Sequence, residues 1–211
     1  MNARTATVAA PPLADGKRRL IKAALRLAAK HGTGLSSLGL RELAREADLN
    51  HNTFYRHFDH LDDLGRAAAA EVVPQLMAAM KEIRRDAATH KDANVGAAEH
   101  FLDFAQAHPD LIVVGLREIH SGDSPMRAAL KQALAQIAQE SADQMLELGL
   151  DGGMSRATLV EAAAAITYYM FYRALDVIEQ PRERRRVRDE IVAFIRSQFL
   201  GRLELQRATR R

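Results

Sequence analysis

Apolar residues recur along most of the chain at spacings of three and four, which is the period of an amphipathic α-helix. This period predicts a first helix over residues 16–31, from the stripe Leu20, Ala23, Ala24 and Leu27. A second helix is expected after Gly39 and a third after Asn50, whose side chain suits the N-cap position. Six more helices are expected over residues 61–89, 95–107, 110–120, 126–148, 155–179 and 181–207. The pattern therefore predicts an all-α fold of nine helices, with Pro74 marking a kink or a boundary in the fourth.

The composition agrees with a packed helical protein. Of the 211 residues 47% are hydrophobic but only 5% aromatic, and glycine and proline are sparse. The absence of Cys excludes a disulfide scaffold, a zinc finger and thiol catalysis, and it fits a reducing cytosol. No apolar run approaches the ~20 residues that span a bilayer, and residues 1–13 lack the apolar core of a secretory signal. We therefore expect a cytoplasmic protein without membrane insertion, beginning with a disordered leader over residues 1–15.

Basic residues are concentrated near the N-terminus. Residues 1–60 contain ten Lys or Arg and five Asp or Glu, a net charge of +5, whereas the rest of the chain has 20 basic and 22 acidic residues. A basic head on a nearly neutral body indicates a local contact with a polyanion. The alternative is a solvated charged surface without a partner.

A helix-turn-helix pattern lies within this basic head. Two short helices flank the polar turn Asp48-Leu49-Asn50, and Phe54 and Phe58 give the second helix a buried face. Arg with guanine and Asn with adenine are favoured base contacts, so we expect Arg41 and Asn52, together with Thr53, to contact bases. Phosphate contacts are expected from Lys17, Arg18, Arg19, Tyr55 and His57. The alternative is a polar surface with ordinary salt bridges. The full predicted DNA-binding set is Lys17, Arg18, Arg19, Gly39, Arg41, Asn50, His51, Asn52, Thr53, Tyr55, Arg56 and His57.

The same stretch resembles the DNA-binding domain of the TetR family of bacterial repressors. The similar segments are Leu40–Ala44, Asn52–Phe58 and Asp62–Leu64, and the resemblance covers residues 17–65. Gly39 stands where the family usually has Ser or Thr, and Leu61 stands where a Lys commonly contacts phosphate.

This resemblance implies the organisation of the chain. A DNA-binding domain is expected over residues 16–60, and a ligand-binding and dimerisation domain over residues 61–211. The two C-terminal helices of each subunit are expected to pack across a two-fold axis as a four-helix bundle. The implied partners are double-stranded DNA with a palindromic operator and a second copy of the chain.

Three further segments are similar to the FabR/DesT-type branch, which represses unsaturated-fatty-acid synthesis or desaturation: Phe54–Gly65, Leu116–Gly122 and Ala174–Val177. This similarity implies a long-chain acyl-CoA effector and no cofactor, with unsaturated acyl-CoA favouring DNA binding and saturated acyl-CoA opposing it. The alternative is a TetR-like regulator of an efflux pump or a catabolic operon that responds to another apolar small molecule. An efflux regulator of cationic drugs is expected to place acidic residues in its pocket, whereas the candidate polar groups here are basic.

A long acyl chain needs a deep apolar cavity, and Met is adaptable enough to line one. Arg117 and His120 are expected to face a thioester or a CoA phosphate. The alternatives are ordinary core packing for the Met and Phe stripes, a surface salt bridge for Arg117, and a place in the dimer core for Tyr168 and Tyr172. The predicted ligand-binding residues are Met77, Met80, Phe101, Phe104, Leu111, Val114, Arg117, His120, Tyr168 and Tyr172.

No catalytic or metal site is expected. Glu99, His100 and Asp103 lie on one predicted helix, but no second cluster of carboxylates or His accompanies them. The chain also lacks a Ser-His-Asp context, a phosphate-binding glycine loop and a dinucleotide fingerprint. The arginine-rich run over residues 182–188 is interpreted as the solvated start of a helix. The sequence therefore predicts a regulator and not an enzyme.

Overall fold

The computed structural model describes residues 15–89, 91–122 and 124–209, and every regular element within these ranges is a helix. The predicted leader lies outside the described residues except for Asp15, which begins the first helix. None of the helices described is both long and apolar enough to cross a membrane. The elements are α1 (Asp15–His31), η1 (Leu35–Ser37), α2 (Leu40–Glu46), η2 (His51–Arg56), α3 (Leu61–Thr89), α4 (Ala93–Ala107), α5 (Pro109–His120), α6 (Arg127–Glu147), α7 (Arg156–Glu179), η3 (Pro181–Glu183) and α8 (Arg184–Thr209).

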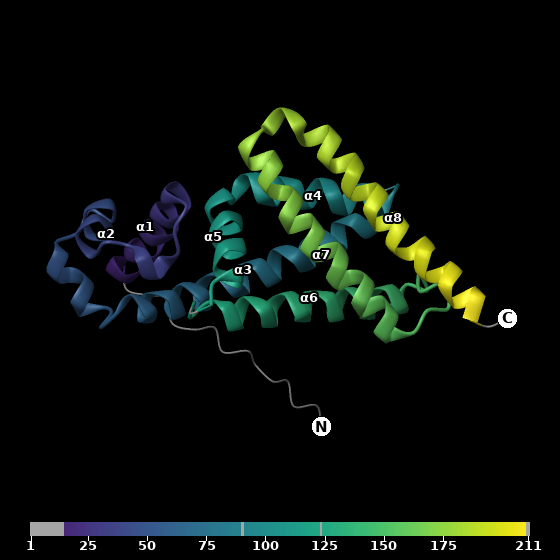
Figure 1. Ribbon diagram of the computed structural model, residues 1–211, viewed down its shortest axis with the longest axis horizontal. Helices are drawn as coiled ribbons and strands as arrows, with labels where there is room; N and C mark the ends of the chain where they lie inside the picture. Colours follow the sequence, from purple (N-terminus) through teal and green to yellow (C-terminus); the bar gives the residue numbers. More distant parts are fainter. Residues whose placement is uncertain (1–14, 90, 123, 210–211) are drawn as a thin grey trace, which may run out of the picture.

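The all-α prediction is confirmed, and the elements form a small head and a larger body (Figure 1). The head consists of α1, α2 and the short 3₁₀ helices η1 and η2, and it packs against the first turns of α3 and against α5. Leu20, Leu43 and Phe54 are fully buried in its core, and Leu64 of α3 joins them. Gly32 ends α1 in the left-handed conformation (φ +63°) that favours glycine, as its place after the apolar stripe predicts.

The helix α3 joins the head to the body. It runs without interruption over 29 residues, about 43 Å at ~1.5 Å per residue, so the predicted boundary at Pro74 is wrong. Pro74 lies on the exposed side of the helix. The remaining body helices pack around α3: α4 and α6 directly, α7 against α6, and α8 against α7 and α4.

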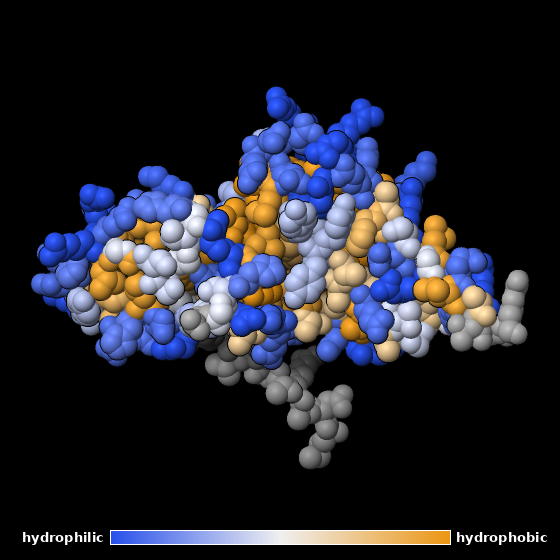
Figure 2. Space-filling view, in the orientation of Figure 1, coloured by the Kyte–Doolittle hydropathy of each residue, from blue (hydrophilic) through white to orange (hydrophobic). Residues whose placement is uncertain are grey.

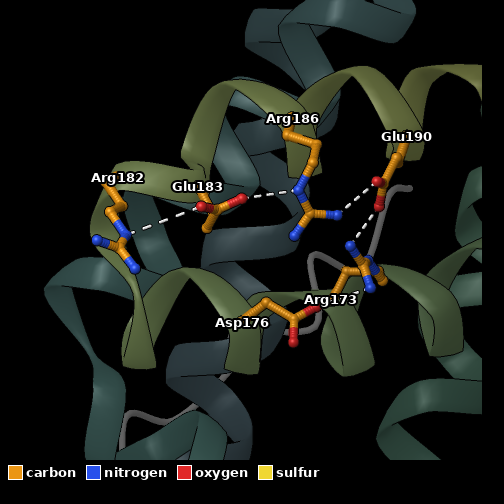
Figure 3. A network of polar contacts seen from close by, with 6 residues as sticks. All are labelled: Arg173, Asp176, Arg182, Glu183, Arg186 and Glu190. Atoms are coloured by element: carbon orange, nitrogen blue, oxygen red, sulfur yellow. Dashed lines mark hydrogen bonds and ion pairs between the residues drawn. The ribbon is translucent and has the colours of Figure 1, made fainter.

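A network of charged side chains holds the turn between α7 and α8 (Figure 3). Arg186 donates to Glu183 (2.7 Å) and to Glu190 (2.6 Å), and Arg173 of α7 also reaches Glu190. The hydrogen bond from Arg186 lowers the pKa of Glu183. These contacts fix how the last two helices leave the turn.

A second row of ion pairs joins α8 to α4. Arg184 contacts Asp103 (2.7 Å), Arg188 contacts Glu99 (2.8 Å), and Arg196 contacts Asp92 (2.6 Å). The arginine-rich start of α8 is therefore not simply solvated, because two of its members bind carboxylates on α4. The same pairing uses the carboxylates weighed as metal ligands, and no cluster able to hold a metal ion occurs among the described residues.

Candidate DNA interface and ligand cavity

The second half of the helix-turn-helix is a short 3₁₀ helix, η2, and not an α-helix. The Asn50 side chain accepts a hydrogen bond from the Asn52 N–H (3.0 Å) and so caps η2 as predicted. Phe54 and Phe58 are 0% and 4% exposed and anchor this segment to the head core. The anchoring leaves Asn52, Tyr55 and Arg56 on the exposed side, with Thr53 half-buried between them.

Several predicted DNA-binding side chains are exposed at this end of the head. Tyr55 is 54% exposed and packs edge-on against His51, with ring centroids 5.8 Å apart. Arg18 and Arg41 are also exposed. Gly39 caps α2 without a side-chain hydrogen bond, as the absence of Ser or Thr predicts.

Three other members of the predicted set make contacts within the head. Arg19 donates to the Asp48 carbonyl (2.7 Å) and carboxylate (3.0 Å), and Asp48 holds the inter-helical turn with φ +51°. Lys17 lies over the Phe58 ring, with Nζ 5.3 Å from the centroid. His57 lies so close to Gly16 that a Cβ there would be 2.7 Å from its Nε2. These side chains fix α1 to the turn and to the end of η2. They therefore hold the exposed residues of η2 in position, and this role does not depend on a contact of their own with DNA.

The head is joined to the body by polar contacts from α5, which form the junction. Glu118 is 2% exposed, and its carboxylate accepts hydrogen bonds from the Leu35 N–H of the head (2.8 Å) and from the Ser124 hydroxyl. Arg117 donates to the Gly32 carbonyl at the end of α1. A buried carboxylate needs such partners, since an unpaired one is costly. The junction therefore ties the segment between α1 and α2 to the end of α5.

The junction also brings α3 against the loop that follows α5. A Cβ on Gly65 would lie 2.6 Å from the Pro125 Cγ, so only glycine fits there without movement. Met126, which follows Pro125 and precedes α6, is 1% exposed. The head ends of α3 and α6 are thus packed without spare room.

At the other end of the body the same two helices line a cavity of about 400 Å³, within the range of roughly 300–1,000 Å³ usual for small-molecule sites. Its wall is largely apolar. The lining residues are Met80, Ile83, Arg84, Ala93, Asn94, Ala97, Ile137, Ser141, Gln144, Met145, Leu148, Leu150, Ala163, Ile166, Thr167, Met170, Ile195 and Phe199. Leu148 (53%) and Leu150 (61%) are also exposed, so the cavity opens to solvent beside the α6–α7 turn.

Residues 20–68 match the family model described as bacterial regulatory proteins, tetR family. The head is a TetR-family domain. The match extends past the predicted boundary at residue 60 into α3, where Leu64 and Ala68 are fully buried.

Solved structures of transcriptional regulators share the fold of most of the chain. A transcriptional regulator from Rhodococcus sp. Rha1 has a TM-score of 0.68 at 22% identity, with 88% of this chain and 96% of that chain covered. A regulator described as putative, from Pseudomonas aeruginosa PAO1, has a TM-score of 0.67 at 16% identity, with 89% and 92% covered. FadR from Bacillus subtilis, solved in complex with stearoyl-CoA, has a TM-score of 0.65 at 15% identity, with 87% and 98% covered. The head thus matches the tetR family model, and the chain shares its fold with these transcriptional regulators.

Of the ten predicted ligand-binding residues, only Met80 lines the cavity. Phe101 packs against Phe171, with centroids 5.0 Å apart, and Phe104 packs against His108 at 4.8 Å. Val114 is fully buried, and Met77 and Leu111 are partly buried against the main core. Arg117 lies at the junction and His120 is exposed at the end of α5.

The two tyrosines of that set lie on the outer face of α7, where Tyr168 is 43% and Tyr172 64% exposed. Sequence reasoning did not identify Arg84 as a cavity residue. A signal was present, because Arg84 follows Met80 by four positions and so lies on the apolar side of α3. An arginine on the core-facing side of a helix indicates that a polar partner lies inside the body, and for Arg84 this partner is Glu140.

Proposed function

We propose that this TetR-type protein is a homodimeric repressor of fatty-acid genes whose affinity for its operator is set by a long-chain acyl-CoA. The observation that carries the proposal is the apolar cavity at one end of α3, the helix whose other end packs under the DNA-binding head. A small molecule in the cavity and the orientation of the head are thereby coupled through one continuous element.

The DNA-binding part rests on the exposed side of the head. Asn52, Tyr55 and Arg56 project from η2 and Arg41 from α2, and all four are exposed. Asn and Arg make the bidentate contacts that distinguish adenine and guanine. A two-fold dimer must place two such heads about 34 Å apart to enter successive major grooves, which fits a palindromic operator.

The dimer part rests on the outer surface of the last two helices. Tyr168 and Tyr172 on α7 and Leu200 and Leu205 on α8 are exposed by 43%, 64%, 63% and 70%. Figure 2 shows apolar and weakly polar surface across the middle of the body, over the region that Figure 1 draws as α7 and α8, with polar side chains around it. Two such surfaces related by a two-fold axis bury these side chains as a four-helix bundle.

The effector part is supported by the chemistry of the cavity and by one structural relative. The wall is mostly aliphatic, and its Met side chains adapt to a flexible chain. FadR from Bacillus subtilis holds stearoyl-CoA on the same fold. A cationic drug is a poorer match, because a cation needs a carboxylate partner. Glu140, the carboxylate beside the cavity residue Arg84, is already paired with Arg84.

Operator titrations test the proposal. DNA from upstream of the chain's own gene is titrated in a gel-shift assay with the protein alone and with stearoyl-CoA, oleoyl-CoA or free CoA. We expect oleoyl-CoA and stearoyl-CoA to change the affinity in opposite directions and CoA to change nothing, since a ligand shifts only an equilibrium between states that it binds unequally. If both acyl-CoAs leave the affinity unchanged, the acyl-CoA part of the proposal fails.

A triple variant tests the DNA-binding part separately. Thr53→Ala/Tyr55→Ala/Arg56→Ala is expected to lose the gel shift while its sedimentation remains that of the wild-type dimer. Exposed Glu204→Ala, near the end of α8, provides a control with unchanged operator binding. Retention of the shift in the triple variant overturns the assignment of η2 as the recognition element.

A further inference from the structure

The arginines of the head form two groups, which differ in whether a carboxylate lies beside them. In α1 every arginine is paired: Arg18 with Asp15 (3.8 Å), Arg19 with Asp48 (3.0 Å) and Arg26 with Glu46 (3.0 Å). His31, at the end of α1, lies 3.4 Å from the Glu42 carboxylate. These contacts involve every carboxylate side chain between residues 15 and 58, so none is left for the other arginines of the head.

The second group consists of the arginines in α2 and η2. Arg41, Arg45 and Arg56 are exposed, and none of them has an ion-pair or side-chain hydrogen-bond partner among the described residues. An arginine side chain carries a positive charge and a planar fork of N–H donors that suits an oxyanion. The helix-turn-helix therefore presents uncompensated arginines, whereas those of α1 are used to hold the head together.

The sequence of α2 separates the two kinds of charge onto two flanks of one helix. Glu42 and Glu46 are four positions apart and lie on the flank that faces α1, where they meet His31 and Arg26. Arg41 and Arg45 have the same spacing and lie on a second flank, about 100° further round the axis. One flank thus fixes α2 to α1, and the other presents two guanidinium groups about 6 Å apart along the helix.

The position of Arg45 in the motif indicates what this flank meets. In a helix-turn-helix the second helix enters the major groove while the first, here α2, crosses the sugar-phosphate backbone. Arg45 lies in the last turn of α2, five residues before the Asn50 that caps η2, and so close to the start of the segment that enters the groove. The planar guanidinium matches the oxygens of a phosphate.

We infer that Arg45 binds a phosphate of the DNA backbone beside the groove that η2 enters. Arg45 is outside the DNA-binding set predicted from the sequence, in which cations of α1 supplied most of the phosphate contacts. The inference rests on the DNA-binding part of the proposed function and deepens it by adding a contact from α2. Arg26, equally exposed in class but paired with Glu46, is assigned no such contact.

The salt dependence of DNA binding tests the inference, because each phosphate contact releases counterions. The full-length protein is titrated by fluorescence anisotropy against a duplex from upstream of the chain's own gene and a scrambled duplex of equal length and composition. In Arg45→Gln the slope of log K against log salt concentration is expected to be less steep by about 0.9 per head, or about 1.8 for a dimer. The advantage of the wild type over the variant then shrinks about twelvefold between roughly 50 and 200 mM salt.

Both duplexes are expected to lose the same factor, since a phosphate contact carries no sequence information. Arg26→Gln is the matched control: it removes the same charge from the same domain, and its slope is expected to equal that of the wild type. Arg45→Lys keeps the charge and is expected to restore the slope, because an ammonium group also binds phosphate. Thermal unfolding of each variant checks that the head is folded.

A wild-type slope in Arg45→Gln overturns the inference, and so does an equal fall in slope in Arg26→Gln, which traces the effect to net charge. A loss confined to the upstream duplex also overturns it, because Arg45 then reads bases. In these cases DNA binding by η2 still stands or falls by the triple variant. If the wild type binds neither duplex, the inference and the DNA-binding part of the proposed function fail together.

Discussion

The two ends of the body differ in how they are packed. At the junction, Glu118 is 2% exposed with both carboxylate oxygens hydrogen-bonded, and Gly65 leaves no room for a methyl group against Pro125. At the other end the same helices, α3 and α6, surround a cavity of about 400 Å³ with a largely apolar wall. One end is filled, and the other is hollow.

For the proposed function, this difference suits the cavity end to ligand binding and the junction end to transmission of the change to the head. A ligand needs space in which to bind, and it shifts an equilibrium only if it binds one state of the protein better than another. A tight contact passes on a displacement because a well-packed interior has no voids to absorb it. The uninterrupted α3 connects the two, so the contrast predicts that substitutions at the junction change stability and coupling, whereas substitutions at the cavity change ligand affinity.

The largest effect is expected from Glu118→Ala at the junction. The substitution leaves the buried Leu35 N–H without its acceptor, which costs about 1–3 kcal/mol, and it also leaves a void. We expect a lower urea midpoint and a loss of the acyl-CoA effect on operator affinity. Glu118→Gln keeps an oxygen acceptor and is the matched control, with most of both properties retained. All unfolding is compared at one protein concentration, because the stability of the proposed dimer depends on it. Equal midpoints for Glu118→Ala and the wild type contradict the role of this bond.

Gly65→Ala is expected to destabilise by about 1–2 kcal/mol, because its Cβ meets the Pro125 Cγ at 2.6 Å and the core must shift. Gly115→Ala in α5 is the control, since no atom lies within 4 Å of a Cβ there. Alanine is the better helix former, so the control is expected to gain up to about 1 kcal/mol. Opposite shifts in the two thermal midpoints support the tight junction, and a gain in both contradicts it.

Ala163→Leu sharpens the contrast at the hollow end. Ala163 is 3% exposed and lines the cavity, so the larger side chain has space and is expected to change stability by less than about 1 kcal/mol. The same change at the fully buried Ala24 of the head is expected to cost about 1–3 kcal/mol, because no cavity receives it. Ala163→Leu should retain operator binding in the gel shift but lose the acyl-CoA response. A retained response places the effector elsewhere.

The smallest effects concern two aspartates at helix starts, one at each end of the body. The side-chain hydrogen bond from Arg66, together with the His60 N–H, lowers the pKa of Asp63 at the start of α3. Partial desolvation raises the pKa of Asp92 before α4, but hydrogen bonds from the Val95 N–H and Arg196 outweigh it, so the net shift is also downward.

A carboxyl whose pKa is lowered by folding stabilises the protein above its ordinary pKa, and this contribution is lost as the pH falls through the lowered value. We therefore expect Asp63→Asn and Asp92→Asn to lower the urea midpoint at pH 7 and to flatten its fall below about pH 4. Asp62→Asn, on the exposed side of the first turn of α3, is the control. A pH profile for both variants that is parallel to that of the wild type is the result that contradicts this account.

The head was predictable from the sequence because its signals are local. Asn50 caps η2, Gly32 ends α1, and Phe54 and Phe58 are buried as their four-residue spacing predicts. The 3₁₀ form of η2 was not predicted, since a six-residue element lacks the length over which the helical period is read. Whether the exposed side chains of this segment contact DNA stays a prediction.

The cavity was largely beyond prediction, because its wall is assembled from five helices whose relative placement no single stretch encodes. Phe101 and Val114 have the same apolar spacing as the lining residues, yet they pack in the solid core. Arg117 was expected beside a CoA group and instead contacts Gly32, since α5 turns its last residues toward the head. The ion pairs between α4 and α8 escaped prediction for the same reason, because their partners lie 81 to 104 residues apart in the chain.

The Leu35–Glu118 bond has a consequence for how the protein is made. Its two residues are 83 positions apart, so at about 5–20 residues per second the ribosome needs roughly 4–17 seconds to add the second after the first. The helix-turn-helix, whose contacts are local, is complete before that interval ends. During those seconds each new head lacks the carboxylate that later fixes its orientation. The proposed regulation by the body therefore begins only once α5 has been synthesised and has docked.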